Sequence, residues 1–145
     1  NTIADALRDI KFETHPDIID LSCFRTFTLA DDLIKIKRSM TEAIRIAKSI
    51  PDKEMLRVFR ALKIDENFED LASRMARVTK MAEVFDEKHW PDGFHYISAE
   101  HNGGDVFLTC DRKFRNYIKE TLKFEGRCKA LSPAELLEKL QSSIP

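Results

Sequence analysis

The sequence predicts an α/β fold: an open parallel sheet with helices on both faces, helix-rich, with an inserted helical hairpin. Three observations lead to this prediction. Residues 105–109 are short and apolar without polar alternation, which is typical of an interior strand of a parallel sheet covered on both faces. Amphipathic helical segments separate this strand from strand candidates at 18–27 and 127–131. The 145 residues, 43% of them hydrophobic, are enough to bury one core, so a single domain over 1–145 is expected.

The first half of the chain predicts mostly helices around one strand. A short helix capped by Thr2 precedes the strand at 18–27, and a long helix over 29–50 keeps its apolar residues on one stripe until Pro51. The segments 55–62 and 68–85 have the same periodicity and predict the helical hairpin. A dimeric coiled coil is less favoured, because the repeat lasts fewer than three heptads.

The second half alternates helices with short strands. Pro91 marks the start of a helix with Phe94, Ile97 and Ser98 turned inward, and Gly103-Gly104 allows a left-handed C-cap. The strand at 105–109 is then followed by a helix over 111–122 and a strand over 127–131. Finally, Ser132-Pro-Ala-Glu135 has the pattern of a capping box and opens a closing helix to about residue 140.

Charge and targeting signals limit the function classes. The formal net charge is −1, so no whole-molecule field attracts nucleic acid or an anionic membrane. Basic residues are in local excess over 35–48 and 112–129, which fits either a solvated helix face or a local binding surface. No apolar run is long enough for a membrane span and no export signal is visible, so a cytoplasmic protein without membrane contact is expected.

The cysteines favour a reducing compartment. Cys23, Cys110 and Cys128 are an odd number without Cys-x-x-Cys spacing, which argues against a disulfide framework or a zinc ribbon. Cys23 and Cys110 adjoin apolar runs and are expected to be small core residues.

Three carboxylates are candidates for one metal site. Asp111 follows the strand at 105–109, Asp92 opens the helix before it, and Asp31 opens the long helix after the earlier strand. In an open α/β sheet such positions meet at the carboxyl ends of the strands. Because clustered carboxylates repel one another, the set predicts Mg²⁺ or Mn²⁺ as a counter-ion. Thr109 would orient a ligand or a bound water. His95, three residues after Asp92, is favoured as an ordinary hydrogen-bonded histidine.

Four segments carry a resemblance to a known family. Asp92-Gly-Phe-His-Tyr-Ile-Ser-Ala-Glu100, Gly104-Asp-Val-Phe-Leu-Thr-Cys-Asp-Arg-Lys-Phe114 and Leu131-Ser-Pro-Ala-Glu-Leu-Leu137 resemble the C-terminal half of a PIN-domain nuclease. Phe27-Thr-Leu-Ala-Asp-Asp-Leu33 is similar to the segment that supplies the family's second acid. The resemblance implies a Mg²⁺- or Mn²⁺-dependent endoribonuclease for single-stranded RNA, with Asp92 and Asp111 as metal ligands. Asp31, or its neighbour Asp32, stands where the family usually has glutamate, and Thr109 matches its small hydroxyl residue.

The start of the chain departs from the family pattern. PIN domains begin with a strand that ends in Asp-Thr-Asn or Asp-Thr-Ser, whereas this sequence starts at Asn1-Thr2. The first strand and its aspartate are therefore expected to be missing here, or to be supplied by another segment or chain. A rival placement uses residues 18–22 as the opening strand, with Asp20 as first acid and Ser22 as hydroxyl residue, but it leaves no good second acid.

The resemblance also implies partners. A VapC-like toxin would pair with a small antitoxin protein and form a homodimer. Loss of the first acid would instead favour an inactive PIN-like scaffold that binds RNA or protein. A receiver-like module that holds one magnesium for phosphate signalling is a third hypothesis, but the lysine that it needs at a later strand end is not evident.

Overall fold

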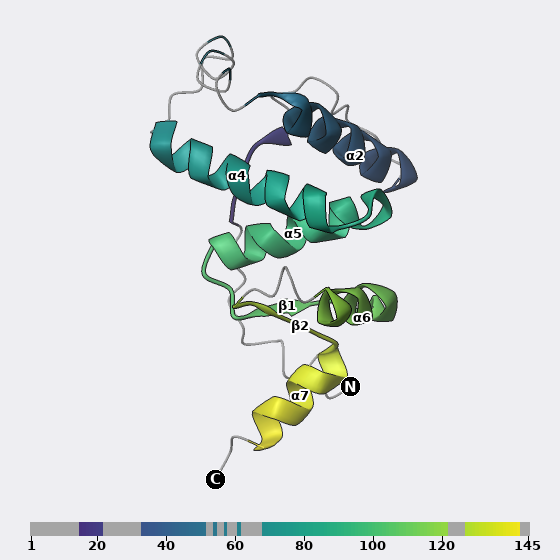
Figure 1. Ribbon diagram of the computed structural model, residues 1–145. Helices are drawn as coiled ribbons and strands as arrows, with labels where there is room; N and C mark the ends of the chain where they lie inside the picture. Colours follow the sequence, from purple (N-terminus) through teal and green to yellow (C-terminus); the bar gives the residue numbers. More distant parts are fainter. Residues whose placement is uncertain are drawn as a thin grey trace.

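The computed structural model describes residues 15–21, 33–51, 68–121 and 127–142, together with Glu54, Arg57 and Ala61. Helices dominate this part of the chain (Figure 1). In order, the elements are α2 (Leu33–Ser49), α4 (Phe68–Val84), the short 3-10 helix η2 (Glu87–His89), α5 (Trp90–His101), β1 (Val106–Leu108), α6 (Arg112–Glu120), β2 (Lys129–Leu131) and α7 (Pro133–Ser142).

The described elements form layers, with α5 in the middle. Figure 1 shows α2 and α4 above α5, the strand pair below it, and α7 on the far side of the pair. Contacts between residues agree with this view, because α5 touches α2, α4 and β1, while α7 touches β2. None of the described helices is long and apolar enough to cross a membrane.

The two strands confirm the predicted parallel pairing. Phe107 lies opposite Ala130, and α6 belongs to the crossover between the strands, as parallel neighbours require. Beyond the paired residues, the amide of Lys129 donates to the carbonyl of Asp105 at 2.9 Å, and that of Thr109 donates to the carbonyl of Leu131 at 2.9 Å. The α/β class is therefore shown.

Whether β1 is an interior strand stays a prediction, but the expectation that both its faces are covered is wrong within the described residues. There β1 pairs with β2 alone, and Leu108 is 49% exposed. Leu108 is exposed because α5 packs on one side of β1, whereas α7, on the other side of the sheet, contacts β2.

The strand predicted at 18–27 is also wrong where the structure describes it, at residues 18–21. Residues 18 and 19 form a bend and none of the four belongs to a strand, although Ile18, Ile19 and Leu21 are buried as an apolar strand would be. Side chains satisfy the backbone here: the amide of Ile18 donates to Ser98 Oγ at 3.0 Å, and its carbonyl accepts from Arg74 Nη1 at 2.9 Å. Residues 22–27 lie outside the described part.

The long helices follow their predicted periodicity. In α2 the stripe of Met40, Ala43, Ile44 and Ala47 is buried. In α4 the buried residues include Leu71, Met75, Val78 and Ala82, and Phe85, just after the helix, is buried too. The helix at 2–10, the start of the helix at 29–32 and most of the segment 55–62 lie outside the described residues. The helical hairpin as a whole therefore stays a prediction.

The predicted left-handed C-cap at Gly103 and the predicted capping box at Ser132 are confirmed. Ser132 Oγ accepts from the amide of Glu135 at 3.1 Å, and Glu135 Oε2 accepts from the amide of Ser132 at 3.3 Å, which completes the capping box. At the end of α5, Gly103 adopts φ 85°, a left-handed conformation that glycine reaches without Cβ strain.

Two surface contacts tie α2 to the start of α5. The guanidinium of Arg45 binds both oxygens of Glu87, at 3.0 and 3.2 Å, and Lys48 Nζ lies 5.7 Å from the ring centre of Trp90. The hydrogen bond from Arg45 lowers the pKa of Glu87, and the same bond raises the pKa of Arg45. Both partners are about half exposed, so the pair orients η2 more than it stabilises the fold.

The placement of Cys110 contradicts the expectation of a small core residue. It is exposed, because the strand ends at Leu108 and the chain then turns outward into α6. Cys128 is the buried thiol, and Cys23 lies outside the described residues. Burial and, to a smaller extent, the nearby carboxylates of Glu100 and Asp105 raise the pKa of the Cys128 thiol to about 11.

We expect the two described cysteines to differ in reactivity at pH 8. With a pKa of about 11, only roughly one Cys128 in a thousand is a thiolate, and the side chain is also shielded. Iodoacetamide labelling followed by peptide mapping should show Cys128 reacting at least about a hundredfold more slowly than Cys110. The difference should vanish in denaturant, and equal rates in the native protein would contradict the burial of Cys128.

Gly93 allows α5 to approach α4 closely. A Cβ at this position would lie 2.7 Å from Phe85 Cδ2 and 2.9 Å from Met81 Sδ. The ring of Phe85 cannot move aside easily, because the rings of Phe114 and Tyr117 pack edge-on against it, with 6.4 and 5.2 Å between ring centres. The steric conflict therefore outweighs the preference of helices for alanine, which is about 1 kcal/mol.

We expect Gly93→Ala to lower the free energy of unfolding by about 1–3 kcal/mol in urea denaturation. Glu83→Ala, at an exposed position of α4, is the control and should change it by less than about 0.5 kcal/mol. A stabilised Gly93→Ala variant would show that the contact between α4 and α5 is looser than described.

Candidate functional site

Asp111 begins α6 at the carboxyl end of β1. Its Oδ1 accepts from the amide of Phe114 at 3.0 Å, the hydrogen bond of a helix N-cap. Its own amide donates to Thr109 Oγ at 3.1 Å, and Arg115 Nη1 donates to the carbonyl of Thr109 at 2.7 Å. These bonds fix the turn from β1 into α6, so the exposed carboxylate of Asp111 has a defined position.

Asp92 lies in the first turn of α5 and is half-buried. Pro91 precedes it at the start of the helix, where a missing amide hydrogen has no cost. The helix dipole favours a carboxylate at this position, so Asp92 has a structural explanation as well as a chemical one. The prediction that Asp92 opens a helix is confirmed.

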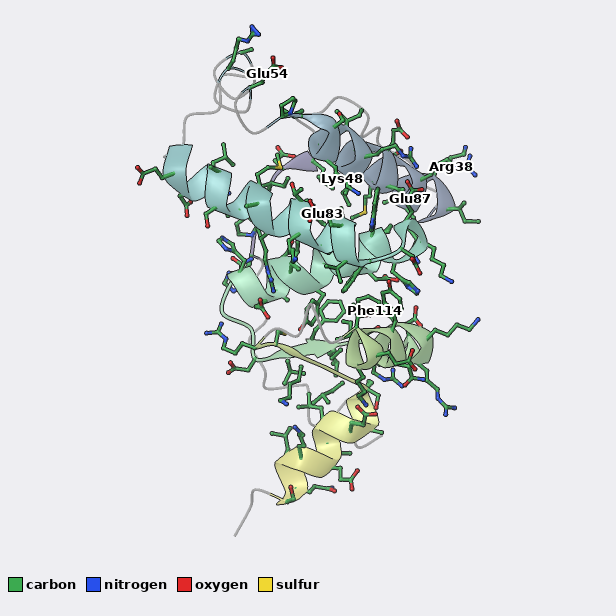
Figure 2. All side chains as sticks on the ribbon, viewed as in Figure 1. Arg38, Lys48, Glu54, Glu83, Glu87 and Phe114 are labelled. Atoms are coloured by element: carbon green, nitrogen blue, oxygen red, sulfur yellow. The ribbon has the colours of Figure 1, made fainter. Side chains whose placement is uncertain are left out.

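An aromatic contact joins the start of α5 to α6. His89, the N-cap of α5, stacks on Tyr117 of α6 with 3.9 Å between ring centres and lies 6.3 Å from the ring of Phe114. The Tyr117 hydroxyl also accepts from the amide of Asp86 at 2.8 Å. Figure 2 shows Phe114 rising from α6 towards α5. The start of α5 therefore lies against α6, the helix that follows β1.

No sequence pattern predicts that His89 and Tyr117 stack on each other. His89 stands directly before Trp90-Pro91, so its position ahead of a helix could be predicted, but not the ring on which it stacks. Tyr117 is expected only as one of the apolar residues of α6.

The predicted metal ligands are only partly described. Asp92 lies at the start of α5 and Asp111, with Thr109, at the start of α6, whereas Asp31 and Asp32 lie outside the described residues. Within residues 15–21, 33–51, 68–121 and 127–142, no three or more His, Cys, Asp or Glu side chains are grouped so that they could hold a metal ion. The carboxylate oxygens suit Mg²⁺ or Mn²⁺ in kind, but this part of the chain holds at most an incomplete ligand set.

The other candidates take different positions. Asp20, the first acid of the rival placement, is exposed in a segment that forms no strand. His95 is exposed and lines a polar pocket of about 490 Å³ together with His15, Ser98 and Asn102. Ser98 in that pocket is buried and accepts the amide of Ile18, so it is a structural residue.

Comparisons with known proteins add no family assignment. Neither a protein-family model, nor a curated protein sequence, nor a solved structure matches the chain. The resemblance to PIN nucleases thus depends on its motifs.

Substitutions at Asp111 can separate its capping role from any chemical one. Asp111→Ala removes the cap and should lower the free energy of unfolding by about 1 kcal/mol. Asp111→Asn should be nearly neutral, because asparagine caps helices as well as aspartate does. Urea denaturation of both variants measures this. Equal losses would mean that the charge, and not the capping hydrogen bond, is what stabilises α6.

Proposed function

We propose that this protein is a Mg²⁺- or Mn²⁺-dependent endoribonuclease with a PIN-like fold, which hydrolyses phosphodiester bonds of single-stranded RNA. One observation carries the proposal: Asp111 caps α6 at the carboxyl end of β1, and the start of α5, which holds Asp92, is joined to α6 by the stacking of His89 on Tyr117. Carboxylates from two elements at such an edge are what a hydrolytic metal site needs.

The candidate site residues have the following roles in this proposal. Asp92 and Asp111 hold the cation, Thr109 keeps Asp111 in place through its hydroxyl, and Asp31 completes the ligand set. When bound, the divalent cation supplies an activated water and offsets charge on the leaving oxygen. The exposed Arg112 and Lys113 in the first turn of α6 attract the RNA phosphates close to this edge.

The partners extend the same proposal. A VapC-like toxin would bind a small antitoxin protein and form a homodimer. The motif resemblance alone supports these partners, and the proposed hydrolysis does not depend on them.

An inactive PIN-like scaffold that binds RNA or protein is the second candidate. It is favoured by the engagement of Asp111 Oδ1 as a helix cap. Such a protein would keep the basic surface of α6 and bind RNA without cleaving it.

The decisive assay measures cleavage of single-stranded RNA by the complete protein with Mn²⁺, and again after chelation with EDTA. We expect cleavage with Mn²⁺ and none with EDTA. Asp92→Asn and Asp111→Asn should each slow cleavage by about a hundredfold or more, because each removes a charged ligand while keeping the shape of the side chain.

The matched control is Asp105→Asn. Asp105 is exposed and lies just before β1, at the end of the strand opposite Asp111, so its variant should cleave at the unchanged rate. Wild-type rates in the Asp92 and Asp111 variants would reject the assignment of these acids. RNA binding without cleavage in the unmodified protein would select the scaffold.

A further inference from the structure

A pocket of about 450 Å³ lies between α4 and the C-terminal half of α5, and cations line it. Arg74, Arg77 and Lys80 follow one another at three-residue steps, so they share one face of α4. Ile97 of α5 and Ile18 supply apolar wall opposite them. About eight residues of α5, roughly 12 Å, separate this pocket from Asp92 at the other end of the helix.

The two arginines are held in position by the protein. Arg74 Nη1 donates to the carbonyl of Ile18 at 2.9 Å and its Nε to Asp70 Oδ2 at 3.1 Å, and its side chain is only 13% exposed. Arg77 Nη2 donates to Glu100 Oε1 at 2.7 Å. Because these bonds fix the guanidinium planes beforehand, a ligand that binds them causes little further loss of side-chain entropy.

Charge favours an anion in this pocket. Its lining carries three formal positive charges, on Arg74, Arg77 and Lys80, and the paired carboxylates of Asp70 and Glu100 offset two of them. The carbonyl end of α5 faces the same region and disfavours anions, so the cations of α4 must outweigh it. Planar guanidinium groups are suited to bidentate contacts with phosphate, and the volume suits a ligand of about mononucleotide size.

We propose that this pocket is an anion site for a phosphate group, held by Arg77 and Lys80 of α4, with the apolar wall against the organic part of the ligand. The phosphate belongs either to a free mononucleotide or to the backbone of an RNA strand. The site goes beyond the proposed hydrolysis and does not depend on it, because it uses none of the carboxylates at the start of α5.

The experiment titrates the protein with adenosine 5′-monophosphate and, separately, with a short single-stranded RNA in EDTA, and follows backbone amides by NMR. We expect shifts at Ala76, Ile97 and His101 with at least one probe. Lys80→Gln should weaken that binding roughly threefold, because Lys80 is exposed and its loss removes charge from the pocket without disturbing the fold. Lys139→Gln, an equally exposed lysine on α7, is the matched control and should bind as the unmodified protein does.

Arg77→Gln tests the same site through a second residue and should weaken binding about tenfold, with circular dichroism to check the fold. Shifts with the mononucleotide alone identify a free nucleotide as the ligand, whereas shifts with RNA identify the backbone. Absence of shifts at these amides with both probes, or equal affinities for Lys80→Gln and the unmodified protein, would overturn the proposal. The RNA cleavage assay is independent, since Asp92→Asn leaves the pocket intact.

Discussion

The burial of α5 between a helical layer and a two-stranded sheet is the constraint on which the rest of the structure depends. A sheet of two short strands cannot form a core alone, so the core is built around this helix. Trp90, Phe94 and Ile97 are almost fully buried, and they belong to the same cluster as residues of α2 and α4. Gly93 adds to this packing, because its missing side chain leaves room for the ring of Phe85.

Polar groups in the second half of α5 tie distant segments to the core. The Tyr96 hydroxyl donates to the carbonyl of Cys128, next to β2, and Asn102 Nδ2 donates to the carbonyl of Pro16 at 2.8 Å. Glu100 bridges two elements, since one oxygen binds Arg77 and the other accepts from the amide of Cys128 at 3.2 Å. Buried polar atoms are tolerated here because they have partners, and these partners fix where β2 and residues 15–21 lie.

Local patterns predict the elements of this fold better than its cross-connections. The periodicity of α4, the capping box at Ser132 and the helix start at Asp92 depend on neighbours in sequence, and each is confirmed. The backbone conformation at 18–21 and the exposure of Leu108 depend on residues far away, such as Ser98 and the contacts of α7. For the candidate site, the helix starts were predictable, but the stacking of His89 on Tyr117 was not, since no sequence rule selects partners between two helices.

The two ends of α5 present opposite electrostatic conditions. At its start the amide dipoles stabilise Asp92 without any cation. Binding of a metal ion at this end is therefore favourable only if a second carboxylate, such as Asp111, also coordinates the ion. At its other end the carbonyl dipoles repel anions, and only the cations of α4 make a phosphate favourable there. Either ligand therefore needs a second helix beside α5: α6 at the start and α4 at the end. Under both proposals, binding depends on the contacts between helices, and substitutions that loosen those contacts should impair it even when no ligand-binding residue is changed.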